Sequence, residues 1–119
     1  MKKVYIASPY AGLRCDDNIR AYIALKVAKE AYIKVKKAGF MPVSPVIELD
    51  GKVDEATQRD IAINAGLDML KDCDYIYFST HPDAKFSKGM QIEREKAKEL
   101  FIPEISINAN GSVDILLGL

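Results

Sequence analysis

The stretch KVYIASPY (residues 3–10) begins with a short apolar, β-branched run that stops at Ser8-Pro9. A strand that is apolar throughout, rather than at every second position, is typical of a sheet covered on both faces. Similar runs follow at residues 40–45, 74–79 and 102–107, with helical periodicity between them at 19–37, from Thr57 to about residue 71, and around Glu93. This alternation predicts a three-layer α/β fold with a parallel sheet of four to five strands and helices on both faces.

The segment between the second strand and the second helix, VIELDGKVDEA (46–56), is predicted to be a loop. Thr57 and Asp60 then have the spacing of a capping box, which would start the second helix. In a parallel sheet ligands gather at the carboxyl ends of the strands, near the switch in strand order. Polar residues follow the predicted strands at Ser8, Ser44 and Ser79, so this edge of the sheet is the expected site.

Composition indicates one soluble globular domain spanning residues 1–119, since 17 basic side chains balance 17 acidic ones and 49% of the residues are hydrophobic. No net charge draws the chain to nucleic acid or to an anionic membrane, and no run of residues predicts a signal peptide or a membrane span. Two isolated cysteines (Cys15, Cys73) and one histidine (His81) suggest reduced thiols, a cytoplasmic location and no metal site.

One charged residue of FSKGMQIEREKAKEL (86–100) lies on the apolar side of the predicted helix. At about 100° per residue, Glu93 falls within roughly 60° of the helix's small and apolar positions, whereas the other charged residues lie far round the helix. A carboxylate directed inward over the strand ends is a candidate catalytic group. The alternative is a structural role, in which Glu93 pairs with a lysine or tyrosine at the edge of the core or caps a loop.

Three common sites of α/β folds do not match. SPYAG (8–12) has one glycine where a dinucleotide site needs GxGxxG, and the chain has no P-loop. A phosphoacceptor receiver would need acidic residues where Ser8 and Ser79 stand.

The motifs YIASPY (5–10), LDMLKDCDYIYF (67–78) and SKGMQIE (87–93) resemble those of the nucleoside 2-deoxyribosyltransferase superfamily, which includes the 2′-deoxynucleoside 5′-phosphate N-hydrolases. The resemblance spans residues 3–107 and is nearest to uncharacterised branches of that superfamily. It implies a flavodoxin-like (Rossmann-like) fold, a nucleoside or nucleotide as ligand, and no metal or organic cofactor. It also implies that Glu93, six residues after Ser87 and four after Gly89, is the catalytic glutamate.

The resemblance assigns roles to further residues. Glu93 would stabilise an oxocarbenium ion or capture it as a glycosyl ester. Ser87, with the N–H groups of Lys88 and Gly89, would bind a 5′-phosphate, although Ser87 could equally be an ordinary helix N-cap. The pocket wall would be formed by Ser8, Pro9 and Tyr10.

The chain departs from the characterised enzymes at Gly66, where they carry an aspartate that orients the nucleophile or protonates the leaving base. Asp60 and Asp68, the nearest acidic residues on that helix, point in other directions and do not replace it cleanly. His81 could protonate a leaving base, and Ser112, with Asn108 and Asn110, could reach a neighbouring subunit. Each of these accessory residues could also be an ordinary surface or loop residue.

These observations predict cleavage or transfer of the N-glycosidic bond of a (deoxy)nucleoside 5′-monophosphate or nucleoside. The alternatives are a nucleotide-binding sensor or accessory module without turnover, which Gly66 favours, and a structural domain without a ligand. A homodimer or a multiple of it is expected, because the apolar run VDILLGL (113–119) and a second apolar stripe (Ile19, Ile23, Val27) offer surfaces for a partner. The C-terminal run would then lie near the neighbour's pocket.

Overall fold

The computed structural model describes residues 1–55 and 57–116. Five strands form one sheet in the order β2-β1-β3-β4-β5: β1 (Lys3–Ala7), β2 (Met41–Val43), β3 (Tyr75–Phe78), β4 (Glu104–Ile107) and β5 (Val113–Leu116). The helices are α1 (Arg20–Lys37), α2 (Pro45–Glu48), α3 (Arg59–Leu70) and α4 (Lys88–Glu99), with short 3₁₀ turns η1 (Asp17–Ile19) and η2 (Pro82–Phe86). No described helix is both long and apolar enough to cross a bilayer.

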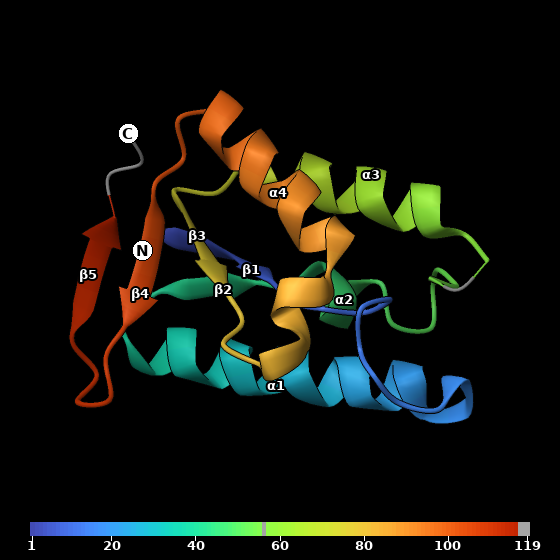
Figure 1. The fold of residues 1–119 in the computed structure, drawn as a ribbon. Coiled ribbons are helices and arrows are strands. Elements are labelled where there is room, and N and C mark those ends of the chain that lie inside the picture. Colours follow the sequence, from blue (N-terminus) through green and yellow to red (C-terminus); the bar gives the residue numbers. More distant parts are fainter. Residues whose placement is uncertain (56, 117–119) are drawn as a thin grey trace.

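Helices cover both faces of the sheet, with α3 and α4 on one side and α1 on the other (Figure 1). Because successive side chains of a strand point to opposite faces, the central strands contribute to two separate cores. The core on the α3 and α4 side contains the buried residues Tyr5, Ala7, Leu70, Cys73, Ile76, Met90 and Ala97. The core on the α1 side contains Val4, Ile6, Ala31, Val35, Tyr77 and Ile105. The three-layer α/β fold predicted from the alternation of elements is thereby confirmed.

The sheet is parallel except at β5, which pairs antiparallel with β4. The cause is the short connection between them, in which the Asn108 N–H donates to the Ser112 carbonyl at 2.8 Å and Gly111 has a φ of +87°. A tight turn of this length can join only antiparallel strands, whereas a parallel pair needs a crossover of a dozen or more residues. The part of VDILLGL within the described residues therefore extends the protein's own sheet.

The predicted loop 46–56 is wrong at its start, since Pro45–Glu48 form α2. Ser44 caps this helix, because its Oγ accepts from the Ile47 N–H at 3.3 Å, and Pro45 supplies a preset φ at the first helical position. A helix of four residues is too short for hydrophobic periodicity to reveal it.

The predicted capping box of Thr57 and Asp60 is also wrong. Helix α3 begins at Arg59, and no side chain caps it. Thr57 instead belongs to a turn, since the N–H groups of Thr57 and Gln58 both donate to the Asp54 carbonyl. The Gln58 side chain accepts from the Asp54 N–H at 3.0 Å. This side chain therefore stabilises the turn and does not cap the helix.

The chain runs from β1 to β2 on one side of β1 and later returns as β3 on the other side. This is the 2-1-3-4-5 order, whose switch point lies between β1 and β3, and ligands bind outside the carboxyl ends of the strands at such a point. The Ser79 N–H donates to the Ala7 carbonyl at 2.8 Å, which holds these two strand ends together. The topology therefore predicts a ligand site near the residues that follow Ala7.

Candidate functional site

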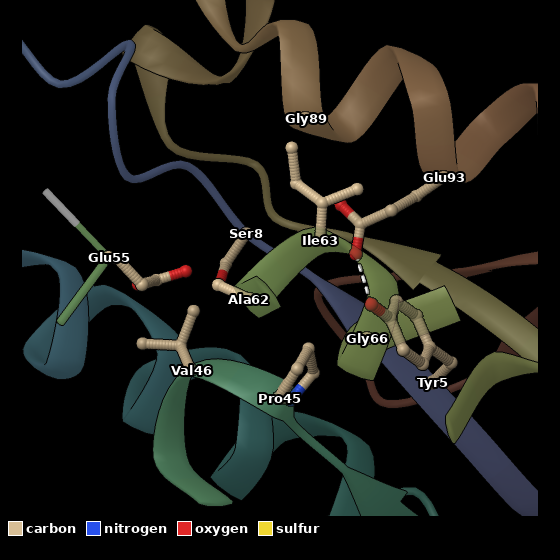
Figure 2. Close-up of a pocket in the computed structure, with 10 residues that line it drawn as sticks. All are labelled: Tyr5, Ser8, Pro45, Val46, Glu55, Ala62, Ile63, Gly66, Gly89 and Glu93. Carbon is tan, nitrogen blue, oxygen red and sulfur yellow. Dashed lines mark hydrogen bonds between the residues drawn. The ribbon is translucent and has the colours of Figure 1, made fainter. Parts of the chain in front are cut away.

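A partly open cavity lies beyond the carboxyl end of β1, on the α3 and α4 side of the sheet (Figure 2). Its water-accessible volume is about 40 Å³, and it opens to solvent. Strand β1, the loop after it, helices α2, α3 and α4, and the segment before α3 all contribute to its walls. The lining residues are Tyr5, Ser8, Pro45, Val46, Glu55, Ala62, Ile63, Gly66, Gly89 and Glu93.

Glu93 is held on the inner side of α4, where Met90 and Ala97 bury the helix against the sheet. The residue as a whole is half-buried, its carboxyl group points inward, and its Oε2 accepts a hydrogen bond from the Tyr5 hydroxyl (Figure 2). Burial raises the pKa of Glu93 to about 8, against smaller lowering effects of the Tyr5 hydrogen bond and of Arg59. The carboxyl group therefore keeps its proton far above the pH at which a solvated glutamate loses it.

Tyr5 is a site residue that the sequence analysis did not identify. It is fully buried, and burial followed by the nearby Glu93 raises its pKa well above 10, so its hydroxyl stays a donor. Alternation along β1 places Tyr5 and Ala7 on the same face of the sheet. The sequence could therefore predict the direction of the Tyr5 side chain, but not that Glu93 is its partner. The Tyr5 contact also matches the structural alternative for Glu93, in which the carboxylate pairs with a tyrosine at the edge of the core.

Gly66 is the position of the missing aspartate, and it packs directly against Tyr5. A Cβ placed there would lie 2.8 Å from the Tyr5 hydroxyl oxygen and 3.6 Å from Cβ of Pro45. The tyrosine hydroxyl therefore occupies the space into which a side chain at position 66 would project. The departure at Gly66 and the Tyr5–Glu93 contact are parts of one packing arrangement.

Glu55 adds a second carboxyl group to the cavity, and the sequence analysis gave no sign of it. Its side chain is 16% exposed, although the residue lies in the irregular segment between α2 and α3. Its Oε1 is 3.8 Å from Nη1 of Arg59, which is an ion pair but too long for a hydrogen bond. Burial raises the pKa of Glu55, and Arg59 opposes that rise.

Arg59 also approaches the first turn of α4. A Cβ at Gly89 would lie 2.6 Å from Nη2 of Arg59, so a larger residue there would make the end of the Arg59 side chain shift away from the helix. Arg59 therefore stands between Glu55 and the N-terminus of α4. Its charge also lowers the pKa of Glu93.

The other predicted pocket residues are distributed around this cavity. Ser8 lines it, and its Oγ is buried without a hydrogen-bond partner among the described residues, whereas Pro9 is fully buried. Tyr10 is not among the residues that line the cavity, and burial, followed by Glu55, raises its pKa. Gly89 lines the cavity beside Glu93.

Ser87 and Lys88 lie at the start of α4. Ser87 is 1% exposed, and its Oγ accepts from the Met90 N–H at 3.2 Å, which makes it the N-cap of the helix. It borders a neighbouring hollow with Phe78 and Ser79 rather than the cavity around Glu93. The Lys88 side chain is exposed.

The accessory candidates lie away from Glu93. His81 borders a hollow over α1, with Glu30 and Lys34, and its Nδ1 accepts from the Asp83 N–H at 3.0 Å. Asp60 is exposed on α3, as is Asp68, which pairs with Lys71 at 3.3 Å. In the β4–β5 turn, Ser112 bonds to Asn108 and Asn110, both of which are exposed. Residues 117–119 of the predicted C-terminal contact lie outside the described residues.

Within residues 1–55 and 57–116, no group of three or more histidine, cysteine, aspartate or glutamate side chains could hold a metal ion. The cavity is lined by two carboxyl groups, one phenol and one hydroxyl without a partner among the described residues, and the Arg59 guanidinium lies 3.8 Å from one of the carboxyl groups. Paired carboxyl groups whose pKa values are raised by burial are suited to nucleophilic and acid–base chemistry.

Comparisons with known proteins agree with the fold. A solved structure of the 2-deoxyribosyltransferase from Bacillus psychrosaccharolyticus superposes with a TM-score of 0.57 over 86% of this chain and 69% of that one, at 20% sequence identity. At that identity the likeness shows a shared fold. No curated protein matches the sequence. The model of one family, described as a domain of unknown function (DUF7768), matches residues 2–107, and the chain therefore belongs to the DUF7768 family.

Proposed function

We propose that this protein cleaves or transfers the N-glycosidic bond of a nucleoside or (deoxy)nucleoside 5′-monophosphate, with Glu93 as the nucleophile. The observation that carries the proposal is the Glu93 carboxyl group, held inward by Tyr5 at the carboxyl end of β1. A buried carboxyl group at the switch point of this fold costs stability, and a functional role accounts for that cost. The shared fold with a 2-deoxyribosyltransferase supports the same class of reaction.

The chemistry follows from the geometry of a carboxylate facing a bound sugar. An oxygen of ionised Glu93 bonds to C1′ as the bond from C1′ to the base breaks, which gives a glycosyl ester and the free base. Water then displaces Glu93 in a hydrolase, and a second base displaces it in a transferase. The Tyr5 hydroxyl keeps the attacking oxygen in place and favours its ionised form.

The first turn of α4 is the proposed site for a 5′-phosphate. The N–H groups of Lys88 and Gly89 stand at the positive end of the helix dipole, and the Arg59 guanidinium lies against Gly89. A phosphate there would be about one helical turn from Glu93. Ser87 would act by shaping this turn as its N-cap.

The proposed assembly is a homodimer or a multiple of it. Large apolar side chains are exposed at the β5 edge and nearby, at Phe101, Ile115 and Leu116. An edge strand with exposed apolar side chains is a natural surface for a second copy.

The test incubates the protein with a panel of nucleosides and nucleoside 5′-monophosphates and measures free base by chromatography. Wild-type protein should release base from at least one of them. Glu93→Gln should retain binding and lose at least about 10³-fold in turnover, because the amide cannot form the ester. Glu95→Gln, on the exposed side of the same helix, is the matched control. Binding without base release by the wild type would indicate a nucleotide-binding module, and base release by Glu93→Gln at the wild-type rate would remove Glu93 from the reaction.

A further inference from the structure

The reaction proposed above needs a second group, because a purine or pyrimidine leaves C1′ readily only when a proton neutralises the negative charge that develops on it. The relatives that the sequence resembles use an aspartate at the position of Gly66. Here the Tyr5 hydroxyl occupies the space that a side chain at position 66 would need, because its oxygen lies 2.8 Å from where a Cβ would be. A side chain elsewhere must therefore supply the acid.

We propose that Glu55 is the group that protonates the leaving base and later deprotonates the attacking water or acceptor. The inference rests on the proposed function. Glu55 and Glu93 line the same cavity, and they enter it from opposite sides, with Ser8 and Ile63 between them (Figure 2). A nucleophile attacks C1′ from the face opposite the departing base, so the proton donor must stand across the sugar from the nucleophile.

The surroundings of Glu55 suit an acid that becomes a base. Burial favours its protonated form before reaction, and Arg59, 3.8 Å away, stabilises the carboxylate that remains after the proton has left. The charged and titratable groups that interact with it are Arg59 from α3, Glu93 from α4, Tyr5 from β1 and Tyr10 from the loop after β1. Burial is the main cause of the raised pKa of Glu55, and the Arg59 charge opposes it.

The proton balance of the two steps is complete. In the first, Glu93 bonds to C1′, the electron pair of the C1′–N bond passes to the base, and the Glu55 proton passes to the base as well. In the second step, the oxygen of water or the nitrogen of an acceptor base bonds to C1′. The Glu55 carboxylate accepts the proton that this atom loses. As that new bond forms, the C1′–O bond to Glu93 breaks and its electron pair stays on the Glu93 carboxylate, so both carboxyl groups return to their starting states.

The decisive variant is Glu55→Gln, measured on two substrates. With ordinary nucleoside 5′-monophosphates the rate of base release in the first turnover should fall by about 10²- to 10⁴-fold, which is the usual contribution of a general acid. With an N7-methylated purine nucleotide, whose base leaves without an added proton, that first-turnover rate should fall by less than about tenfold. Later turnovers should slow, because Glu55 also serves as the base of the second step. Equal losses on both substrates, or no loss on either, would overturn the role of Glu55.

A pH profile of kcat/KM provides a second, independent measurement. The active state has one proton on the pair, on Glu55 and not on Glu93. Because burial holds that proton mainly on Glu93 in the free protein, the active state is a minor one, and the wild type should show a low bell. In Glu55→Gln the alkaline limb should disappear, because only the ionisation of Glu93 remains. A retained alkaline limb would assign that limb to another group and contradict the proposal.

Two further variants separate folding from chemistry. Glu55→Asp keeps a carboxyl group and should retain more activity than Glu55→Gln, while Glu48→Gln, an exposed carboxylate on the neighbouring α2, should behave as wild type. Thermal unfolding of each variant checks that the fold is intact. The failures of the two proposals are distinguishable: no base release by the wild type refutes both, whereas full activity of Glu55→Gln refutes only this one.

Discussion

The Tyr5 hydroxyl donates a hydrogen bond to the Glu93 carboxyl across the gap between the first strand and the fourth helix. The bond joins residues 88 positions apart, and Gly66 leaves the space that the phenol needs. A carboxyl group with a pKa of about 8 would be mostly protonated at neutral pH, and this bond is the largest of the effects that favour ionisation. Tyr5 thus governs how much of the proposed nucleophile is available.

Tyr5→Phe should lower activity through this effect. Loss of the hydrogen bond raises the pKa of Glu93 further, so the acidic limb of the kcat/KM profile should move to higher pH. Loss of one buried partner should also destabilise the fold by about 1–3 kcal/mol. The pH profile is the measurement, and Tyr22→Phe on the exposed side of α1 is the control. An unmoved limb would show that the bond does not control ionisation.

Gly66→Ala should destabilise the protein by about 1–3 kcal/mol, because the new Cβ would lie 2.8 Å from the Tyr5 hydroxyl oxygen. Replacing glycine by alanine inside a helix normally stabilises it by about 1 kcal/mol, so the sign of the change is informative. Denaturant unfolding provides the value, and Asn64→Ala, exposed on the same helix, is the comparison. A stabilised Gly66→Ala variant would mean that Tyr5 moves aside at little cost.

The pH dependence of stability should reveal the buried Glu93. Its pKa is raised from 4.5 to about 8 on folding, so between these values the unfolded chain releases the proton and the folded chain keeps it. The stability contributed by this carboxyl group is therefore present below pH 4.5 and is lost as the pH rises to about 8.

Glu93→Gln should remove that dependence. Its free energy of unfolding should exceed that of the wild type by more at pH 8 than at pH 5, by an amount on the order of a few kcal/mol. Urea unfolding at the two pH values checks this, with Glu95→Gln as the exposed control. A difference that is constant with pH would mean that Glu93 ionises normally.

Binding at the first turn of α4 should depend on phosphate. Nucleoside monophosphates should bind better than the matching nucleosides, and Arg59→Gln should reduce this preference by about tenfold, because a charge-assisted contact is lost. Ser87→Ala should destabilise the fold by about 1 kcal/mol, because the N-cap is lost. It should also reduce the preference for monophosphates over nucleosides. Calorimetric titration gives both affinities. Equal affinities in the wild type would leave Ser87 as an N-cap only.

The oligomeric state should be a dimer or a multiple of it. Light scattering at tens of micromolar should give at least twice the 13.2 kDa of one chain. Ile115→Lys, at an exposed position of β5, should shift the protein toward the monomer, whereas Ile33→Lys, exposed on α1, should not. A fully active wild-type monomer would exclude a shared site.

The sequence by itself determined the layers of the fold and the position of Glu93. Continuous apolar strands and 3.6-residue periodicity are local patterns, and burial on one or both faces imposes them directly. The same periodicity placed Glu93 on the inner side of α4, because a helix fixes the direction of each side chain relative to its neighbours. Short and irregular elements, such as α2 and the turn before α3, carried too few residues for such a pattern.

Only the tertiary structure decided which groups face Glu93. Tyr5 reaches it across 88 positions of sequence, and Glu55 enters the cavity from a segment without regular structure. Neither position follows from a local period, because each depends on how α3 and α4 pack over β1. The glycine at position 66 illustrates the limit: in the sequence it is a missing aspartate, and in the fold it is the space that a tyrosine hydroxyl requires.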